Sequence, residues 1–159
     1  MSLLSMIAGL LEAEVRFVVI GGVAATAHGA TRVTNDLDIC YATAPDNLKR
    51  LARRLASWRG YPRGADPGLP FIMDEVTLRR APVLTLTTAQ GDLDCFDAVA
   101  GVGTYAAAAK AAERVTMDQL TFQVLGLSAL IRAKRAAGRP KDREALVELE
   151  ALRELRDKE

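Results

Sequence analysis

Apolar and polar residues alternate along the chain with two different periods, which predicts a mixture of strands and helices. Phe17-Val18-Val19-Ile20 is an uninterrupted apolar run, typical of a buried strand over residues 15–20. Small residues fill Gly21 to Gly29, where we expect a tightly packed helix. Residues 36–41 predict a second strand, because acidic and apolar side chains alternate at its start.

The rest of the chain continues this mixture of periods. Helical spacing of apolar residues predicts helices over 3–11, about 46–58, about 104–112, 126–137 and from Pro140 onward, with a Leu stripe in the last one. Strands are expected at 83–88 and 92–96, as a hairpin around Gly91, and at 114–118 and 121–125. Residues 59–70, rich in Gly and Pro, should form a loop, and 71–80 has no assignment.

These elements predict an α/β (α+β) fold with a mixed sheet, flanking helices and C-terminal helices. We expect a single domain over residues 1–159, because no linker or repeat divides the chain. Its core should span about 15–125, and its C-terminal helical element about 126–157.

Overall charge and composition give no preference for nucleic acid or for a membrane. The 159 residues carry a formal net charge of +1 and are half hydrophobic. No apolar run reaches the length of a membrane span, and the N-terminus lacks the basic region of a signal peptide. We therefore expect a soluble, cytoplasmic protein in which Cys40 and Cys95 are small core residues.

Candidate chemistry begins with two carboxylates in the second predicted strand. Asp36 and Asp38 lie two residues apart, so in a strand their side chains point to the same face. Like charges held together repel and raise each other's pKa unless a cation lies between them. A hard divalent ion with oxygen ligands, such as Mg²⁺, removes this repulsion. The alternative is a turn or surface strand with solvated acids.

A third carboxylate is expected from the hairpin strand Gly91 to Phe96. Asp92 and Asp94 share a face of that strand, and Asp94 lies deeper, between Leu93 and Cys95. We therefore choose Asp94 as the third ligand and interpret Asp92 as the residue at the hairpin end. The alternative is that both are polar residues on the solvated side of a hairpin. The glycine pair Gly21-Gly22 precedes a predicted helix, and its bare backbone favours an anion site.

Three segments, in this order, resemble a known family. The first runs from Gly21-Gly22 through Arg32 and Thr34 to Asp36-Leu37-Asp38-Ile39. The second is Gly91-Asp92-Leu93-Asp94 with the following Gly101-Val102-Gly103 loop, and the third combines Lys134 with Gly138-Arg139-Pro140-Lys141-Asp142. Together they are similar to the DNA polymerase β-like minimal nucleotidyltransferase superfamily, and most similar to its bacterial abortive-infection-type toxins.

This resemblance implies roles for individual residues. Asp36, Asp38 and Asp94 would ligate Mg²⁺ or Mn²⁺, and Asp94 is also the candidate base. Gly21 and Gly22 would let the backbone approach a nucleoside triphosphate. Lys134 and Lys141 would neutralise its phosphates, Lys141 being counted among the catalytic residues, and Asp142 would orient Lys141 or its neighbours. Arg32 would contact a phosphate or form a structural salt bridge.

The resemblance also implies an activity and its partners. The protein would transfer a nucleoside monophosphate from a triphosphate to an acceptor hydroxyl, as an EC 2.7.7-type enzyme. The acceptor would be an RNA 3′ end such as that of tRNA, a protein or a small molecule, and the setting a toxin–antitoxin system. The rival hypothesis is a non-catalytic nucleotide-binding, antitoxin or partner-binding module on the same fold, with a helical partner protein. The basic stretch from Arg132 to Arg143 fits phosphate binding or, alternatively, a solvated helix face.

Overall fold

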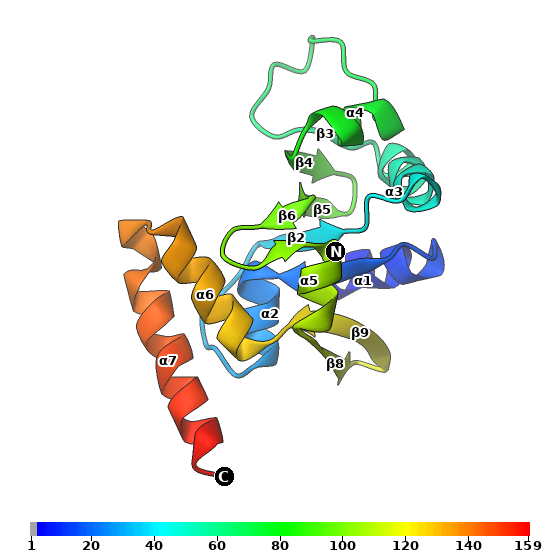
Figure 1. The fold of residues 1–159 in the computed structure, drawn as a ribbon. Helices are drawn as coiled ribbons and strands as arrows, with labels where there is room; N and C mark the ends of the chain where they lie inside the picture. The colour runs from blue at the N-terminus through cyan, green and yellow to red at the C-terminus, as the bar shows by residue number, and fades with distance from the viewer. Residues whose placement is uncertain (1–2) are drawn as a thin grey trace.

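A computed structural model describes residues 3–159 and contains a seven-stranded mixed sheet (Figure 1). The strand order is β3-β4-β5-β2-β1-β9-β8. The strands of this sheet are β1 (Phe17–Ile20), β2 (Asp36–Tyr41), β3 (Tyr61–Pro62), β4 (Val83–Thr88), β5 (Gly91–Phe96), β8 (Ala112–Met117) and β9 (Leu120–Leu125). A two-stranded ribbon pairs β6 (Ala98–Val99) with β7 (Gly103–Thr104).

Helices flank the sheet, and the last two extend beyond it. The helices are α1 (Leu3–Glu12), α2 (Gly21–Ala27), α3 (Pro45–Ser57), α4 (Glu75–Arg80), α5 (Tyr105–Lys110), α6 (Leu127–Ala137) and α7 (Arg143–Asp157). In Figure 1, α6 and α7 lie side by side at one end of the molecule, and their residues contact each other. The expected mixed α+β class is confirmed.

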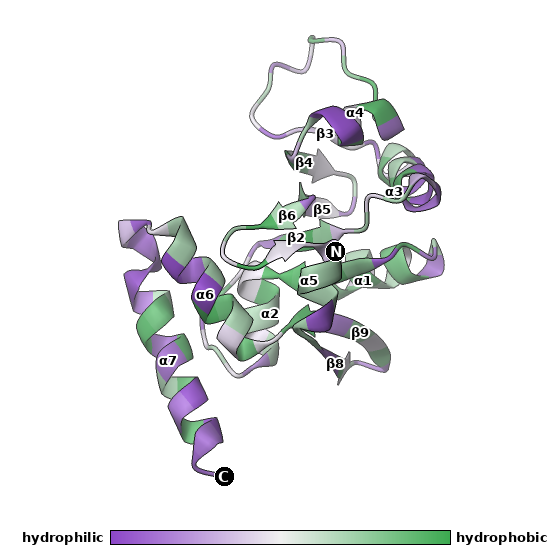
Figure 2. Cartoon of the chain, in the orientation of Figure 1, coloured by the Kyte–Doolittle hydropathy of each residue, from purple (hydrophilic) through white to green (hydrophobic). Residues whose placement is uncertain are grey.

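The centre of the sheet combines parallel and antiparallel pairs. β1 pairs with β2 in antiparallel register and with β9 in parallel register, while β2 and β5 are parallel neighbours. Leu37, Ile39, Leu93 and Cys95 are completely buried, and the residues between them point to the opposite face. Figure 2 shows green, apolar colouring among the central strands and alternating purple and green along α7. The buried side chains thus fix which face carries the acids.

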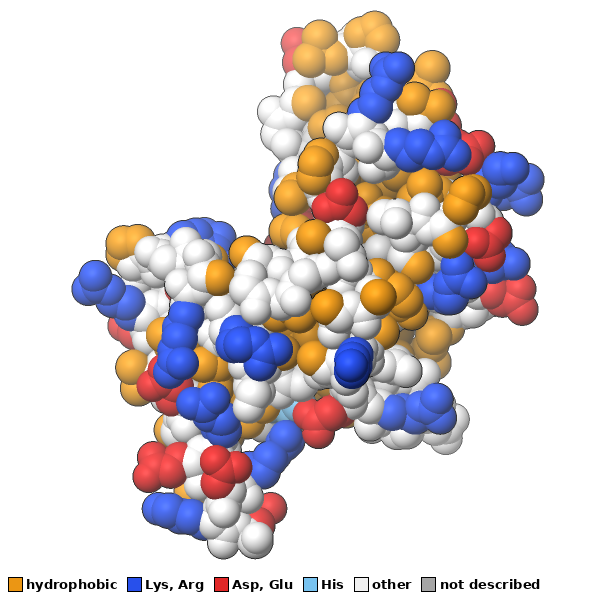
Figure 3. Space-filling view, in the orientation of Figure 1, with side chains coloured by type: hydrophobic (Ala, Val, Ile, Leu, Met, Phe, Trp, Pro, Cys, Tyr) orange, Lys and Arg blue, Asp and Glu red, His pale blue; other side chains and the backbone are white. Residues whose placement is uncertain are grey.

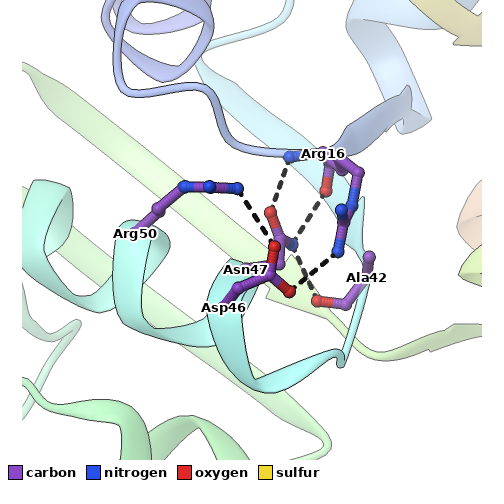
Figure 4. Close-up of polar contacts among 5 residues, drawn as sticks. All are labelled: Arg16, Ala42, Asp46, Asn47 and Arg50. Atoms are coloured by element: carbon purple, nitrogen blue, oxygen red, sulfur yellow. Dashed lines mark hydrogen bonds and ion pairs between the residues drawn. The ribbon is translucent and has the colours of Figure 1, made fainter.

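A buried asparagine holds the ends of the two central strands (Figure 4). Asn47, at the start of α3, accepts a hydrogen bond from the Arg16 amide at 2.7 Å. Its amide group donates to the carbonyls of Arg16 (3.1 Å) and Ala42 (2.7 Å). Asp46 beside it pairs with Arg16 and Arg50. Because one residue binds both the entry to β1 and the exit from β2, it supports the register between these strands.

Several local predictions needed correction. Residues 71–80, left without assignment, contain α4, which is capped by the Asp74 side chain accepting from the Thr77 amide. The loop over 59–70 contains the short strand β3, and the ribbon of β6 and β7 was not predicted. Pro140 begins a 3₁₀ turn that ends at Asp142, so the last helix starts at Arg143.

The expected Leu stripe of the last helix is only partly correct. Leu149 is buried, and Leu146 and Leu152 are partly buried against the core, but the Leu155 side chain is 62% exposed. The stripe fails at its end because α7 extends past the sheet in Figure 1. Across residues 3–159, no helix has both the length and the apolar character needed to cross a membrane.

Candidate functional site

Three carboxylates meet where β2 and β5 run side by side. The parallel register places Asp38 opposite Asp94 and Asp36 opposite Asp92. Asp36, Asp38 and Asp94 each offer one oxygen, and these atoms all lie within 4.8 Å of one another. The structure therefore brings together the three carboxylates that the sequence singled out, and we call them the acidic triad.

Burial and mutual repulsion disfavour the ionised form of the triad in the absence of a metal ion. Burial raises the pKa of Asp38 to about 7, and the charges of Asp36 and Asp94 add to this shift. Burial, and then the charge of Asp94, also raises the pKa of Asp36. The Oδ1 atom of Asp38 is buried and, among the described residues, has no hydrogen-bond partner. A buried acceptor without a donor, beside two more carboxylates, fits the oxygen ligand set of Mg²⁺ or Mn²⁺.

Gly21 is required by the position of the Asp38 side chain. Its φ of +65° is a backbone conformation that L-residues rarely adopt, and a Cβ here would collide with the Asp38 carboxylate. At Gly22 a Cβ would lie 2.6 Å from the Thr34 hydroxyl. The helix that the pair begins has only seven residues, so its dipole is short. The glycines therefore act by allowing close approach more than by forming a helix N-terminus.

A cavity of about 300 Å³, lined by both charged and apolar side chains, lies next to the triad on the side of the C-terminal helices, and we call it the lysine cavity. Its lining includes Gly21, Gly22, Arg32, Lys134, Lys141 and Asp142, all the remaining residues that the sequence predicted for nucleotide binding. Figure 3 shows Lys and Arg side chains gathered over α6 and its junction with α7. The positive charge near this cavity suits a phosphate-bearing ligand.

The cations at this cavity are already partly paired. Asp142 is buried and accepts from Lys134 Nζ at 3.2 Å and from Arg139 Nε at 2.7 Å. Burial alone would raise the pKa of Asp142, but the hydrogen bonds from Arg139 and Lys134 hold it below its ordinary value. Asp142 thus orients these neighbours, and within residues 3–159 no hydrogen bond or ion pair joins it to Lys141. Arg32 lines the cavity and also pairs with Glu144 at 2.7 Å.

Comparison with known proteins gives matches among solved structures. Neither a family model nor a curated protein sequence matches the chain. A crystal structure from Thermotoga maritima, described as that of a "putative nucleotidyltransferase", aligns with a TM-score of 0.56 and 14% sequence identity. The alignment covers 93% of this chain and 94% of that one. The two chains share a fold.

This nucleotidyltransferase-like fold agrees with the expectation drawn from the three sequence segments. At 14% identity the likeness concerns the arrangement of helices and strands, so the roles of individual residues rest on the geometry of the acidic triad and the lysine cavity. His28, the single histidine of the sequence, has a structural contact, because its Nε2 lies 2.9 Å from the Leu125 carbonyl oxygen.

The sequence did not identify Arg63, which contacts the triad directly. Its Nη2 donates to Asp94 Oδ1 and to the Leu86 carbonyl, both at 2.7 Å, and its Nε lies 3.5 Å from Asp92 Oδ2. Arg63 follows β3, and its backbone amide bonds the Thr85 carbonyl of β4. No local motif marks this residue, because its position depends on β3 pairing with the edge of the sheet.

Proposed function

We propose that the protein is a metal-dependent nucleotidyltransferase that uses Mg²⁺ or Mn²⁺. The observation that carries the proposal is the acidic triad, three carboxylate oxygens within 4.8 Å, beside a cavity lined by glycines and lysines. Asp36, Asp38 and Asp94 would hold the ion. When bound, it supplies charge neutralisation for the phosphates and activation of the acceptor hydroxyl.

The reaction is an in-line displacement at the α-phosphorus of a nucleoside triphosphate. The acceptor oxygen forms a bond to this phosphorus, and the bond to the oxygen that bridges to the β-phosphate breaks. Pyrophosphate leaves with the electron pair, and the hydroxyl proton passes to a base, for which Asp94 is our candidate. Arg63 would hold one Asp94 oxygen in place during this step, since it donates to Oδ1 at 2.7 Å.

The lysine cavity supports binding of the triphosphate. Gly21 and Gly22 line it without side chains, and Lys134 and Lys141 supply compact positive charges. Asp142 holds the Lys134 ammonium in place. The Lys134 side chain therefore loses less conformational entropy when it binds a phosphate. In this proposal Lys141 is the exposed cation that closes on the ligand.

We propose a biological setting on the resemblance alone. The acceptor would be the 3′ hydroxyl of an RNA such as tRNA, a protein hydroxyl or a small molecule. The protein would act as a toxin restrained by an antitoxin, in the cytoplasm where nucleoside triphosphates are available. Expression alone and together with its genomic neighbour would test this role, because a toxin stops growth only when expressed alone.

The activity itself is tested with nucleoside triphosphates radiolabelled at the α-phosphate, incubated with the protein, Mg²⁺ and cell extract. We expect label in a macromolecule or a small acceptor and release of pyrophosphate. Asp94→Asn should lower incorporation at least about a hundredfold. Asp92→Asn, on the same strand but outside the triad, is the matched control and should change it much less. Equal incorporation by wild type and Asp94→Asn would contradict the proposal.

A further inference from the structure

The last helix, α7, carries two apolar stripes, although a helix on the surface of a protein needs only one to pack against its core. The stripe that packs against the core consists of Leu146, Leu149 and Leu152. On the other side of the helix, Val147 is 68% exposed and Leu155 is 62% exposed. Ala151 is exposed as well and lies midway between them in the sequence. We call Val147, Ala151 and Leu155 the outer stripe.

The outer stripe is narrow and continues into charged residues at both ends. At 3.6 residues per turn, its three side chains lie within an arc of about 80° centred on Ala151. Glu144 at the start of α7 and Lys158 just after its last turn fall within the same arc. In Figure 1 the helix lies at one end of the molecule, and its C-terminal half extends past the sheet. The outer stripe is therefore accessible to another protein chain.

This helix face is complementary to itself in one orientation. If two copies meet in antiparallel direction at Ala151, Val147 of one copy lies level with Leu155 of the other. Glu144 then lies level with Lys158 of the other copy, so opposite charges meet at both ends. In a parallel pair each charged residue would instead meet its own equivalent, and like charges would repel. The pattern therefore favours a second copy of this chain, in antiparallel direction, over a different partner.

Both charged residues remain available for such a contact. Glu144 pairs with Arg32 at 2.7 Å and Lys158 with Glu154 at 3.7 Å, and all four side chains are largely solvent-exposed. Exposed ion pairs contribute little, and a carboxylate or ammonium group can bind more than one partner. The Arg32 contact also holds the loop before β2 beside the first half of α7, where the neighbouring Val33 is 89% exposed. Val33 adds to the apolar surface next to the outer stripe.

We propose that the outer stripe is an interface between two copies of this chain, with α7 packed against α7 in antiparallel direction about a two-fold axis at Ala151. The small Ala151 side chain lets the helices approach closely, and Val147 of each copy packs against Leu155 of the other. Such a symmetric contact ends at a dimer. A single helix face, about 22 Å long, is smaller than a standard interface of roughly 800 Å² per partner, so the dimer should exchange with monomer.

This dimer is independent of the proposed function. The lysine cavity is lined by Ala145 and Leu149, which lie on the inner side of α7, away from the outer stripe. Two copies joined through the outer stripe would therefore each keep this cavity and the acidic triad. A failure of the dimer would leave the nucleotidyltransferase proposal unchanged.

Sedimentation equilibrium of the wild-type chain from about 10 µM to about 1 mM tests for association. We expect the mass to rise toward twice that of one chain. Leu155→Glu should weaken association at least about tenfold, because each dimer loses two buried apolar contacts. Leu155→Met keeps an apolar side chain and is the matched control, which should still associate. A wild-type mass equal to that of one chain at every concentration would overturn the proposal, and so would unchanged association of Leu155→Glu.

Cysteine cross-linking tests the position of the axis. Ala151→Cys puts two thiols next to each other on the axis and should give a disulfide-linked dimer under mild oxidation. The native Cys40 and Cys95 are buried, so they should not react. Asp157→Cys on the same helix is the control, because its equivalents would lie about 18 Å apart along the paired helices. Equal cross-linking of Ala151→Cys and Asp157→Cys would contradict the proposed axis.

A second pair of variants tests the direction of the helices. An equal mixture of Glu144→Cys and Lys158→Cys should cross-link, because these positions lie level in an antiparallel pair. Glu144→Cys alone should cross-link much less, since its equivalents would lie about 21 Å apart. Stronger cross-linking of Glu144→Cys alone than of the mixture would show a parallel pair and overturn the proposed arrangement.

Discussion

Replacing Asp38 with asparagine should stabilise the metal-free protein at alkaline pH. Burial and the neighbouring charges of Asp36 and Asp94 raise the Asp38 pKa from 3.8 to about 7, so the folded state resists ionisation of this group. The unfolded chain loses the proton near its ordinary pKa. Stability from this group is therefore full below about pH 4 and falls as pH rises toward 7.

The expected size follows from the shift. A change of about three pKa units corresponds to a free energy on the order of 4 kcal/mol. Because the asparagine side chain of the variant cannot ionise, Asp38→Asn should be more stable than wild type by a few kcal/mol at pH 8. The difference should shrink steadily toward pH 4.

Urea unfolding in the presence of a chelator, at several pH values from 4 to 8, measures this difference directly. Asp92→Asn serves as the control, because Asp92 lies on the same face but outside the triad. Mg²⁺ should then raise the stability of wild type and have much less effect on Asp38→Asn. Equal stability of wild type and Asp38→Asn at pH 8 would refute the claim that burial and repulsion strain the metal-free triad.

Three further predictions concern the cations around the site. Arg63→Gln should weaken Mn²⁺ binding roughly tenfold, measured by electron paramagnetic resonance, because the Asp94 carboxylate loses the hydrogen bond that orients it; Arg16→Gln, which removes an ion pair elsewhere, should not. Asp142→Asn should cost about 1–3 kcal/mol in urea unfolding at pH 7, because Lys134 loses its partner. The lowered pKa of Asp142 means that this stabilisation is present above about pH 4 and lost below it, so wild type and variant should converge near pH 3. Lys141→Ala should weaken use of the triphosphate at low concentration and change stability by less than about 0.5 kcal/mol, since its side chain is exposed; full activity in this variant would remove Lys141 from the site.

The triad was predictable because a strand has a strict period of two. Asp36 and Asp38 had to share a face, and the buried Leu93 and Cys95 forced Asp94 onto the opposite face of its own strand. What the sequence does not contain is the parallel pairing of β2 with β5, which brings the two acidic segments into register. That pairing depends on contacts between distant parts of the chain.

Two of the errors share a physical cause. Arg63 and the β6–β7 ribbon depend on which strand lies beside which, and no local pattern encodes this. The start of the last helix was misplaced because proline fits the first turn of a 3₁₀ helix as well as that of an α-helix. Asp142 was expected to orient Lys141 or its neighbours, and it pairs with Arg139, a neighbour of Lys141, as well as with Lys134.

The parallel pairing of β2 and β5 has a consequence for how the protein reaches its native state. Parallel neighbours need a long crossover, and here it contains α3, β3, α4 and β4. Contacts between such distant segments form late and slowly during folding. Asp94 therefore reaches Asp36 and Asp38 only after the crossover segment has folded and β5 has paired with β2. A divalent ion would then bind newly synthesised chains only after they have folded, and the rate at which binding appears during refolding would report closure of the sheet.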